Sequence, residues 1–154
     1  MITFEVTGLP RAKGSWKPIK TKHGKIIMMA NKDKDGIDRN KEWEIMVADK
    51  ALVTMQDKPL MEGALLVLLA FTFPRPKSIT VKKRPHHTVS PDLDKLVRAC
   101  LDAMTHTVYM DDSQIVSINA TKSYCNEDQR PGVSIEVRPH PSLIPIAQTL
   151  PMQC

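Results

Sequence analysis

Strict alternation of apolar and polar residues marks one segment near each end of the chain. Residues 2–7 read ITFEVT, and near the other end Val133, Ile135 and Val137 alternate with polar neighbours. A period of two predicts strands with one buried face. Residues 63–73 (GALLVLLAFTF) are instead apolar almost throughout, and a proline follows them. Such a run predicts a central strand that is covered on both faces.

Two further segments repeat apolar residues at steps of three and four, which marks one face of a helix. The first segment, which Asn40 can cap, has its apolar residues at Trp43, Met46, Val47 and Ala51. The second has them at Leu93, Leu96, Val97, Cys100, Leu101 and Met104. It follows Ser90, a good N-cap residue, and Pro91, which suits the first helical position. We therefore expect the second helix to begin at these two residues.

Two shorter segments also have the pattern of strands. Residues 25–30 read KIIMMA, and residues 114–120 carry apolar side chains at every second position. In the latter, Val116, Ile118 and Ala120 are expected to share one face.

Basic segments that contain glycine or proline are predicted to be loops, at residues 11–25 and 75–90. The second of these is expected to be mobile. From residue 139 onward the chain is rich in proline and has no period, which indicates an extended or disordered tail over residues 139–154. Residues 1–138 are then a single domain, since the whole chain has only 154 residues.

Composition narrows the class of protein. The formal net charge is +5, which is a weak hint of a polyanionic partner. The charge is uneven, because residues 1–90 hold 17 basic and 9 acidic residues whereas residues 91–154 hold 5 and 8. Three cysteines without CxxC spacing argue against a disulfide framework or a zinc ribbon. Since no signal peptide or membrane-spanning run is evident, we expect a cytoplasmic protein without a membrane partner.

Four carboxylates gather in the acidic part of the chain, at Asp92, Asp94, Asp111 and Asp112. They are open to two interpretations. Acids in a first helical turn favour the helix dipole, and acids before a strand suit turns. Alternatively, Mg²⁺ and Mn²⁺ prefer oxygen ligands, and an ion held by such acids can activate water at a phosphodiester. The second interpretation requires that the backbone at Asp92 is not yet helical, because helical residues two apart do not face each other.

Residues 91–114, PDLDKLVRACLDAMTHTVYMDDSQ, resemble the RusA-type Holliday junction resolvases. The shared features are a DLD helix start, an LDAM helix body and a DDSQ element before a strand. Residues 8–14, GLPRAKG, resemble the N-terminal loop of that family more weakly. The resemblance implies an α+β protein with a small mixed β-sheet and two main helices packed on it. It also implies a homodimer, often phage-encoded, that cuts four-way or other branched DNA with Mg²⁺, or Mn²⁺, as cofactor.

Carried over by position, the resemblance makes Asp92, Asp94 and Asp112 the metal-binding and catalytic acids, with Asp111 as an adjacent acid. Arg98 stands where the family has a catalytic Lys, and Lys95 stands where it usually has Asn. Because the pKa of arginine exceeds 12, Arg98 cannot donate a proton. It can stabilise charge on a phosphate, or it can form an ion pair with Asp94 four residues earlier.

The basic residues expected to contact DNA are Arg11, Lys13, Lys17, Lys82, Lys83, Arg84, Lys95 and Lys122. For Lys122 the alternative is a solvated strand end. Trp16 can stack on an unpaired base or pack beneath its loop. His86 and His87 are expected to decorate a DNA-binding loop rather than to bind metal. A non-catalytic protein that binds branched DNA and a metal phosphoesterase acting on small nucleotides are the two other functions that fit the sequence.

Overall fold

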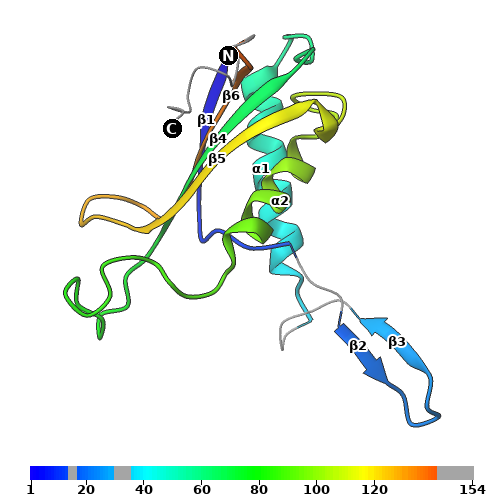
Figure 1. Cartoon of the computed structure of the whole chain (residues 1–154), viewed down its shortest axis with the longest axis vertical. Helices are drawn as coiled ribbons and strands as arrows, with labels where there is room; N and C mark the ends of the chain where they lie inside the picture. Colours follow the sequence, from blue (N-terminus) through cyan, green and yellow to red (C-terminus); the bar gives the residue numbers. More distant parts are fainter. Residues whose placement is uncertain (14–16, 30–35, 142–154) are drawn as a thin grey trace, which may run out of the picture.

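Four strands form a mixed sheet in the computed structural model, which describes residues 1–13, 17–29 and 36–141. The sheet order is β1 (Ile2–Thr7), β6 (Gly132–Pro139), β4 (Leu65–Phe73) and β5 (Ile115–Tyr124). β6 runs antiparallel to both of its neighbours, whereas β4 and β5 are parallel. Figure 1 shows the sheet with two helices, α1 (Arg39–Met55) and α2 (Leu93–Met104), packed on it. The predicted α+β class and mixed sheet are confirmed.

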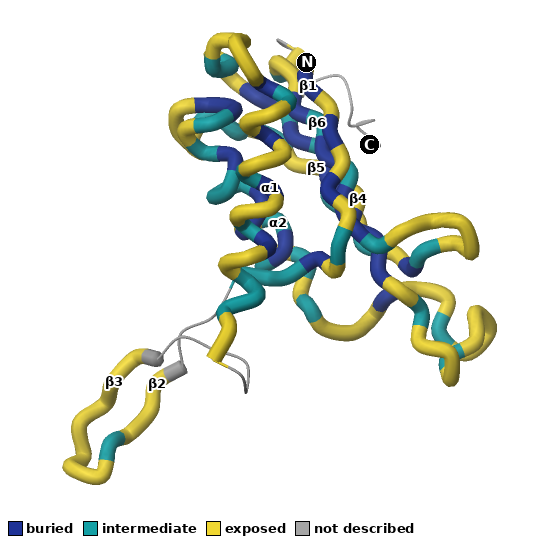
Figure 2. The backbone as a smooth tube through the Cα atoms, turned by 180° about the vertical axis from the view of Figure 1, so that it is seen from behind, coloured by how far each residue is buried: buried dark blue, intermediate teal, exposed yellow. Residues whose placement is uncertain are grey.

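Both helices lie on the same face of the sheet and bury their apolar sides against it (Figure 2). From α1 the core receives Trp43, Val47, Ala51 and Met55, and from α2 it receives Leu96, Ala99, Cys100 and Met104. The strands contribute every second residue, as the alternation in β1 and β6 predicted. Each fully buried Leu or Phe side chain, such as Leu65 or Phe71, contributes about 1.5–3 kcal/mol of transfer free energy to folding.

The prediction that β4 is covered on both faces is wrong. Leu65, Val67 and Leu69 are buried beneath the helices, but Leu66 and Leu68 on the opposite face are only half-buried. The reason is topological, since the described helices both pack on one side of the sheet. Among the described residues, an apolar strip in β4 therefore faces outward between the more polar faces of its neighbours.

Both helices begin at residues other than those expected. α2 begins at Leu93 with Asp92 as N-cap, so Ser90 and Pro91 precede the helix, and the peptide bond between them is cis. In α1 the N-cap is Asp38 rather than Asn40, because the Asp38 carboxylate accepts a hydrogen bond of 3.1 Å from the backbone N–H of Lys41. The apolar periodicity located both helices, but it does not show which of the polar residues before each helix is the N-cap.

β5 continues to Tyr124, four residues beyond the predicted end. A register shift opposite Leu65 and Leu66 pairs these residues with Ile115 and Ser117, so Val116 has no partner in β4. Val116 is exposed, whereas Ala120 is half-buried against the core. The predicted common face of Val116, Ile118 and Ala120 is therefore correct only for the last two, because a bulge breaks the alternation.

The basic segment at residues 11–25 was expected to be a loop, but it contains a strand. β2 (Lys17–Lys20) pairs antiparallel with β3 (Ile26–Met29) as a hairpin that projects from the body of the protein (Figure 1). The strand predicted at residues 25–30 is confirmed as β3, with residue 30 outside the described residues. Trp16 also lies outside them.

Residues 75–90 form no helix or strand, as predicted, and β6 extends to Pro139, the residue at which the tail was expected to start. Residues 142–154 of the predicted tail lie outside the described residues. No helix in the described part of the chain has the length and apolar character needed to cross a membrane.

Candidate active site

Asp92 and Asp94 occupy the start of α2, at the end of the sheet where β4 and β5 finish. Asp92 has an extended backbone, with φ −71° and ψ 140°, and helical geometry begins only at the next residue. The backbone at Asp92 is therefore not helical, which is the condition under which the carboxylates of Asp92 and Asp94 can approach one point. Although Asp92 is the N-cap residue, its carboxylate makes no capping hydrogen bond to the first turn of α2, so its favourable effect on the helix acts only through the helix dipole. Both acids are exposed to solvent.

Lys95 holds the Asp92 carboxylate. Its ammonium Nζ donates a hydrogen bond of 2.8 Å to Asp92 Oδ2, one helical turn away. This hydrogen bond and the lysine charge lower the pKa of Asp92 below its ordinary value. The same contact raises the pKa of Lys95. Asp92 is therefore anionic over the whole physiological range, and one of its oxygens remains available for a cation.

The DDSQ element builds a turn rather than a second acidic pair. Asp111 accepts a hydrogen bond of 2.8 Å from the Ser113 N–H, and Gln114 Oε1 accepts one of 3.2 Å from the Asp111 N–H. Hydrogen bonding from the Ser113 side chain, followed by that from its backbone N–H, lowers the pKa of Asp111. This reciprocal capping box begins the short helix η1 (Asp112–Gln114). Asp111 is thus accounted for by capping, whereas Asp112 is exposed at the first position of the turn.

Gln114 has a structural role that the sequence analysis missed. Its side-chain Nε2 donates a hydrogen bond of 3.0 Å to the Met61 carbonyl, which ties the start of β5 to the segment before β4. The capping pattern, an acid followed three residues later by Gln, was the signal that could have revealed this role.

The three predicted metal ligands do not meet in one chain. The crossover from β4 through α2 to β5 places the start of α2 and the start of β5 at opposite ends of the sheet (Figure 1). The 12 residues of α2 separate its ends by about 18 Å, since a helix rises about 1.5 Å per residue. Ligands of one Mg²⁺ lie about 2.0–2.1 Å from the ion. Accordingly, the described residues hold no group of three or more acids, histidines or cysteines suited to one metal ion.

Two acids alone still suit a magnesium ion. Proteins usually hold Mg²⁺ through one or two carboxylates, with water and substrate phosphate as the other ligands. Asp92 and Asp94 are two such carboxylates at the start of α2, and the structure does not bring Asp112 of the same chain to them.

Lys122 anchors the loop that leads to the acids. Its Nζ donates hydrogen bonds of 2.8 Å to the carbonyls of Val89 and Pro91. Two of its three donors are therefore used within the protein. The sequence had placed Lys122 either on a DNA phosphate or at a solvated strand end, and it indicated no contact with this loop. The contact brings the end of β5 beside the start of α2.

A cluster of rings and guanidinium groups orders the loop at residues 75–90. The Arg75 guanidinium lies 4.1 Å from the centre of the Tyr124 ring and donates hydrogen bonds to the carbonyls of Arg84 and Pro85. Arg84 in turn donates to the Tyr124 hydroxyl over 3.3 Å. Arg84 therefore supports the loop. Lys82 and Lys83, in the same loop, are exposed.

His87 is buried in this cluster instead of decorating the loop surface. Its ring stacks on Phe73 with centroids 4.3 Å apart and lies 4.8 Å from the Tyr124 ring. Burial, followed by the nearby charge of Lys122, lowers its pKa below 6.5, with a smaller contribution from Arg84 in the same direction. His87 is therefore neutral at pH 7. His86, by contrast, is exposed.

Protonation of His87 is expected to weaken the fold at acid pH. The unfolded chain takes up the proton near pH 6.5, whereas the folded chain resists it, so stability is complete above that value and falls as the pH drops below it. The measurement is urea unfolding from about pH 5 to about pH 7.5. A His87→Phe variant, which keeps a ring on Phe73, should lose this part of the pH dependence. An unchanged pH dependence in the variant would contradict the assignment.

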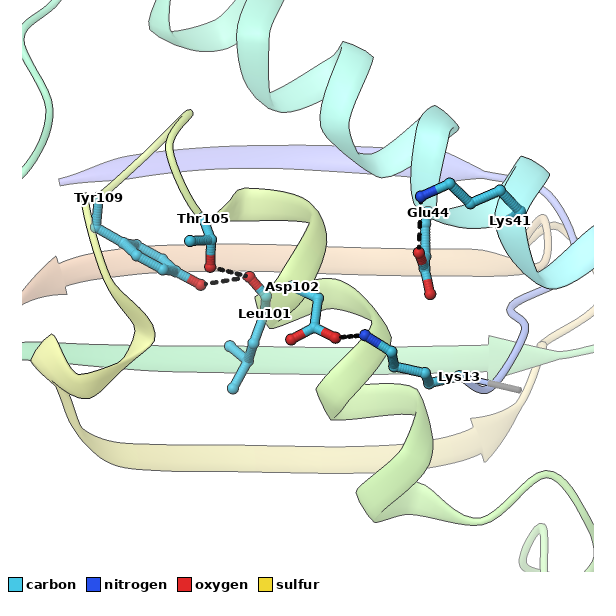
Figure 3. A network of polar contacts seen from close by, with 7 residues as sticks. All are labelled: Lys13, Lys41, Glu44, Leu101, Asp102, Thr105 and Tyr109. Carbon is cyan, nitrogen blue, oxygen red and sulfur yellow. Dashed lines mark hydrogen bonds and ion pairs between the residues drawn. The ribbon is translucent and has the colours of Figure 1, made fainter. Parts of the chain in front are cut away.

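Lys13, one of the N-terminal basic residues, contacts α2. Lys13 forms an ion pair with Asp102 on α2 (Figure 3), and its backbone N–H donates to the Lys95 carbonyl over 3.1 Å. Asp102 is therefore a salt-bridge residue. The same close view shows Tyr109 and Thr105 donating to the Leu101 carbonyl, which closes the far end of the helix (Figure 3).

Arg98 is exposed on α2, one turn after Asp94. Within the part of the chain that the structure describes, no ion pair joins Asp94 to Arg98, so the intrahelical alternative is not supported. Lys17 begins β2, in the hairpin. Of the predicted DNA contacts, those that line one cleft with Asp92 are Arg11, Lys13 and Lys95.

The cleft has a volume of about 520 Å³ and lies between the N-terminal segment, the end of the sheet and the start of α2. Its lining joins cationic side chains to the rings of Phe73, His87 and Tyr124. Such a lining suits an anionic ligand that also has apolar surface.

An α+β fold with acids at a helix start beside a cationic cleft is typical of the class of proteins that bind phosphate-bearing substrates. Comparison with known proteins narrows this class. The family model for the endodeoxyribonuclease RusA matches residues 10–138. The chain belongs to the RusA endodeoxyribonuclease family. It is also 30% identical over 148 residues to the uncharacterized protein YqaN of Bacillus subtilis (strain 168). This match covers 89% of the present chain and 95% of YqaN.

Proposed function

We propose that this protein is a metal-dependent endonuclease that resolves Holliday junctions and related branched DNA. The observation that supports this most directly is Asp92 in the lining of a cationic cleft, with Asp94 two residues further along at the start of α2, in a chain of the RusA family. A cleft of this charge attracts a DNA backbone, because binding to phosphates releases condensed counterions.

Asp92 and Asp94 would hold the metal ion, with Mg²⁺ the first candidate and Mn²⁺ the second. Bound there, the ion would supply a Lewis acid for the phosphate and lower the pKa of a coordinated water. Lys95 keeps Asp92 ionised and in place. Lys122 holds the backbone that precedes Asp92. Arg98, exposed one turn beyond Asp94, would place its guanidinium against a phosphate oxygen.

The proposed active form is a homodimer, since two symmetric cuts need two symmetric sites. A dimer would also resolve the separation of the acids. Asp112 lies at the far end of α2 from Asp94, so it can complete a site only in another chain. We propose that Asp112 of the partner subunit approaches the Asp92–Asp94 pair.

A non-catalytic protein that binds branched DNA is the second candidate. The observation in its favour is that the described residues of one chain form no group of three metal ligands.

The test uses a labelled four-way junction and a linear duplex of the same sequence, each with Mg²⁺ and with EDTA. We expect paired nicks in the junction with Mg²⁺, little cutting of the duplex, and none with EDTA. Equal cutting of duplex and junction would contradict junction selectivity. Tight binding without cutting in either metal would favour the second candidate. Activity on free nucleotides alone would indicate a small-molecule phosphoesterase.

A further inference from the structure

The hairpin of β2 and β3 has no acidic residue. Residues 18–28, the part of it whose burial the structure describes, include no buried side chain. Residues 17–29 read KPIKTKHGKIIMM, with four lysines and one histidine. The register pairs Ile19 with Ile27 and Lys20 with Ile26. Paired residues share a face, so apolar side chains lie on both faces of the ribbon. Figure 2 shows the hairpin as exposed along almost its whole length.

The exposure of the apolar side chains is large enough to require an explanation. Ile26 is 67% exposed, Met28 is 55% exposed and Ile19 is 44% exposed. An isolated two-stranded hairpin is at best marginally stable in water. A ribbon that packs neither face on the protein therefore has surface to offer to a partner.

Charge decides what kind of partner fits. The four lysines at positions 17, 20, 22 and 25 are not balanced by any acid within the hairpin. Lys20, Lys22 and Lys25 are exposed to solvent, as are most of the residues beside them. A partner with dense negative charge and accessible apolar surface satisfies both features. Duplex DNA has both, in its phosphates and in the groove edges of its bases.

The hairpin follows, in the chain, the N-terminal segment that lines the cleft. Lys13 is tied to α2 by its ion pair with Asp102 and by the hydrogen bond from its N–H to the Lys95 carbonyl. Only three residues lie between Lys13 and the start of β2 at Lys17, so the two Cα atoms are at most about 14 Å apart. The first residue of the ribbon therefore lies within that distance of the N-terminal segment that lines the cleft.

We propose that the hairpin is an arm that lies in a groove of a DNA duplex next to the cleavage site. A two-stranded ribbon fits the major groove in width. Lys20, Lys22 and Lys25 would contact phosphates, and Ile26 and Met28 would contact apolar surface in the groove. This inference rests on the proposed DNA substrate and adds a binding element that is separate from the acids.

The test is the salt dependence of binding to the labelled four-way junction, measured in EDTA so that cleavage plays no part. The variant changes Lys20, Lys22 and Lys25 to Gln. Each phosphate contact contributes a slope of about −0.9 to the plot of log affinity against log salt. The variant is therefore expected to reduce the slope by about 2.7 and to weaken binding about 10²–10³-fold at 0.1 M salt.

A matched control removes the same charge from α1 and the turn that follows it, through Lys41→Gln, Lys50→Gln and Lys58→Gln. This control should change the slope by less than one contact. An Ile26→Ser/Met28→Ser variant should weaken binding by about tenfold with an unchanged slope, because apolar contacts release no counterions. Unfolding curves that match the wild type would show that all three variants fold.

Two results would overturn the inference. One is an unchanged slope and affinity in the lysine variant. The other is an altered sedimentation behaviour with DNA binding intact, which would assign the hairpin to contact between copies of the chain. Failure of the proposed nuclease function can be told apart from failure of this inference. A protein that never cuts DNA can still show the predicted salt slopes in EDTA, and a protein that cuts DNA can fail to show them.

Discussion

An Asp94→Asn variant is expected to lose cleavage of a four-way junction by at least about 10³-fold. This corresponds to a loss of about 4 kcal/mol of transition-state stabilisation, a size typical of removing one ligand from a catalytic metal. Because the carboxylate is exposed and in the first turn of α2, the fold should lose only about 0.3–1 kcal/mol of dipole stabilisation. Binding in EDTA should stay equal or strengthen, because one charge that repels the phosphates is gone.

The measurement compares initial nicking rates with Mg²⁺ and dissociation constants in EDTA for the same junction. Asp49→Asn, which removes an exposed carboxylate from α1, is the matched control and should cut at the wild-type rate. A loss of binding equal to the loss of cutting would assign Asp94 to substrate positioning. Full activity in the variant would exclude Asp94 from the site.

Mixing two inactive variants is expected to restore activity. In the proposed dimer, each site combines Asp92 and Asp94 of one chain with Asp112 of its partner. Homodimers of Asp94→Asn and of Asp112→Asn should each lack cleavage. A heterodimer of the two places both substitutions in the same site and leaves the other site intact, so about half of the wild-type nicking should return.

The returned activity should give single nicks rather than paired cuts, because only one of the two sites is complete. Heterodimers can be isolated by giving each variant a different affinity tag. A heterodimer as inactive as its parents would contradict the shared site. An active Asp112→Asn homodimer would show that Asp112 is not required, and would leave the Asp92–Asp94 pair as the whole acidic site.

The two pairs of acids show how far the sequence analysis reached. Both pairs have the same composition, and both are equally consistent with capping and with metal binding when only spacing is considered. The structure separates them. Asp111 accepts the Ser113 N–H and is a cap, whereas Asp92 makes no capping bond and is held by Lys95. Capping depends on backbone dihedral angles at single residues, which the hydrophobic pattern does not encode.

Lys122 and His87 show a second limit. The sequence placed both of them in contact with DNA or solvent, because each follows or precedes a basic or exposed stretch. In the structure, Lys122 donates to the Val89 and Pro91 carbonyls, and His87 stacks on Phe73. These contacts join residues that are 14 or more positions apart in the chain, and no local pattern predicts them.

Local periodicity by itself determined the strands β1, β4 and β6, the two helices and most of their buried residues. It could do so because burial favours apolar side chains at the repeat of the local backbone, two in a strand and 3.6 in a helix. The motif spacing likewise indicated the family. Only the tertiary structure decided where the acids lie. In the crossover from β4 to β5, α2 packs along the sheet. Asp92 and Asp94 therefore lie at one end of the helix and Asp112 beyond the other end, separated by the length of the helix.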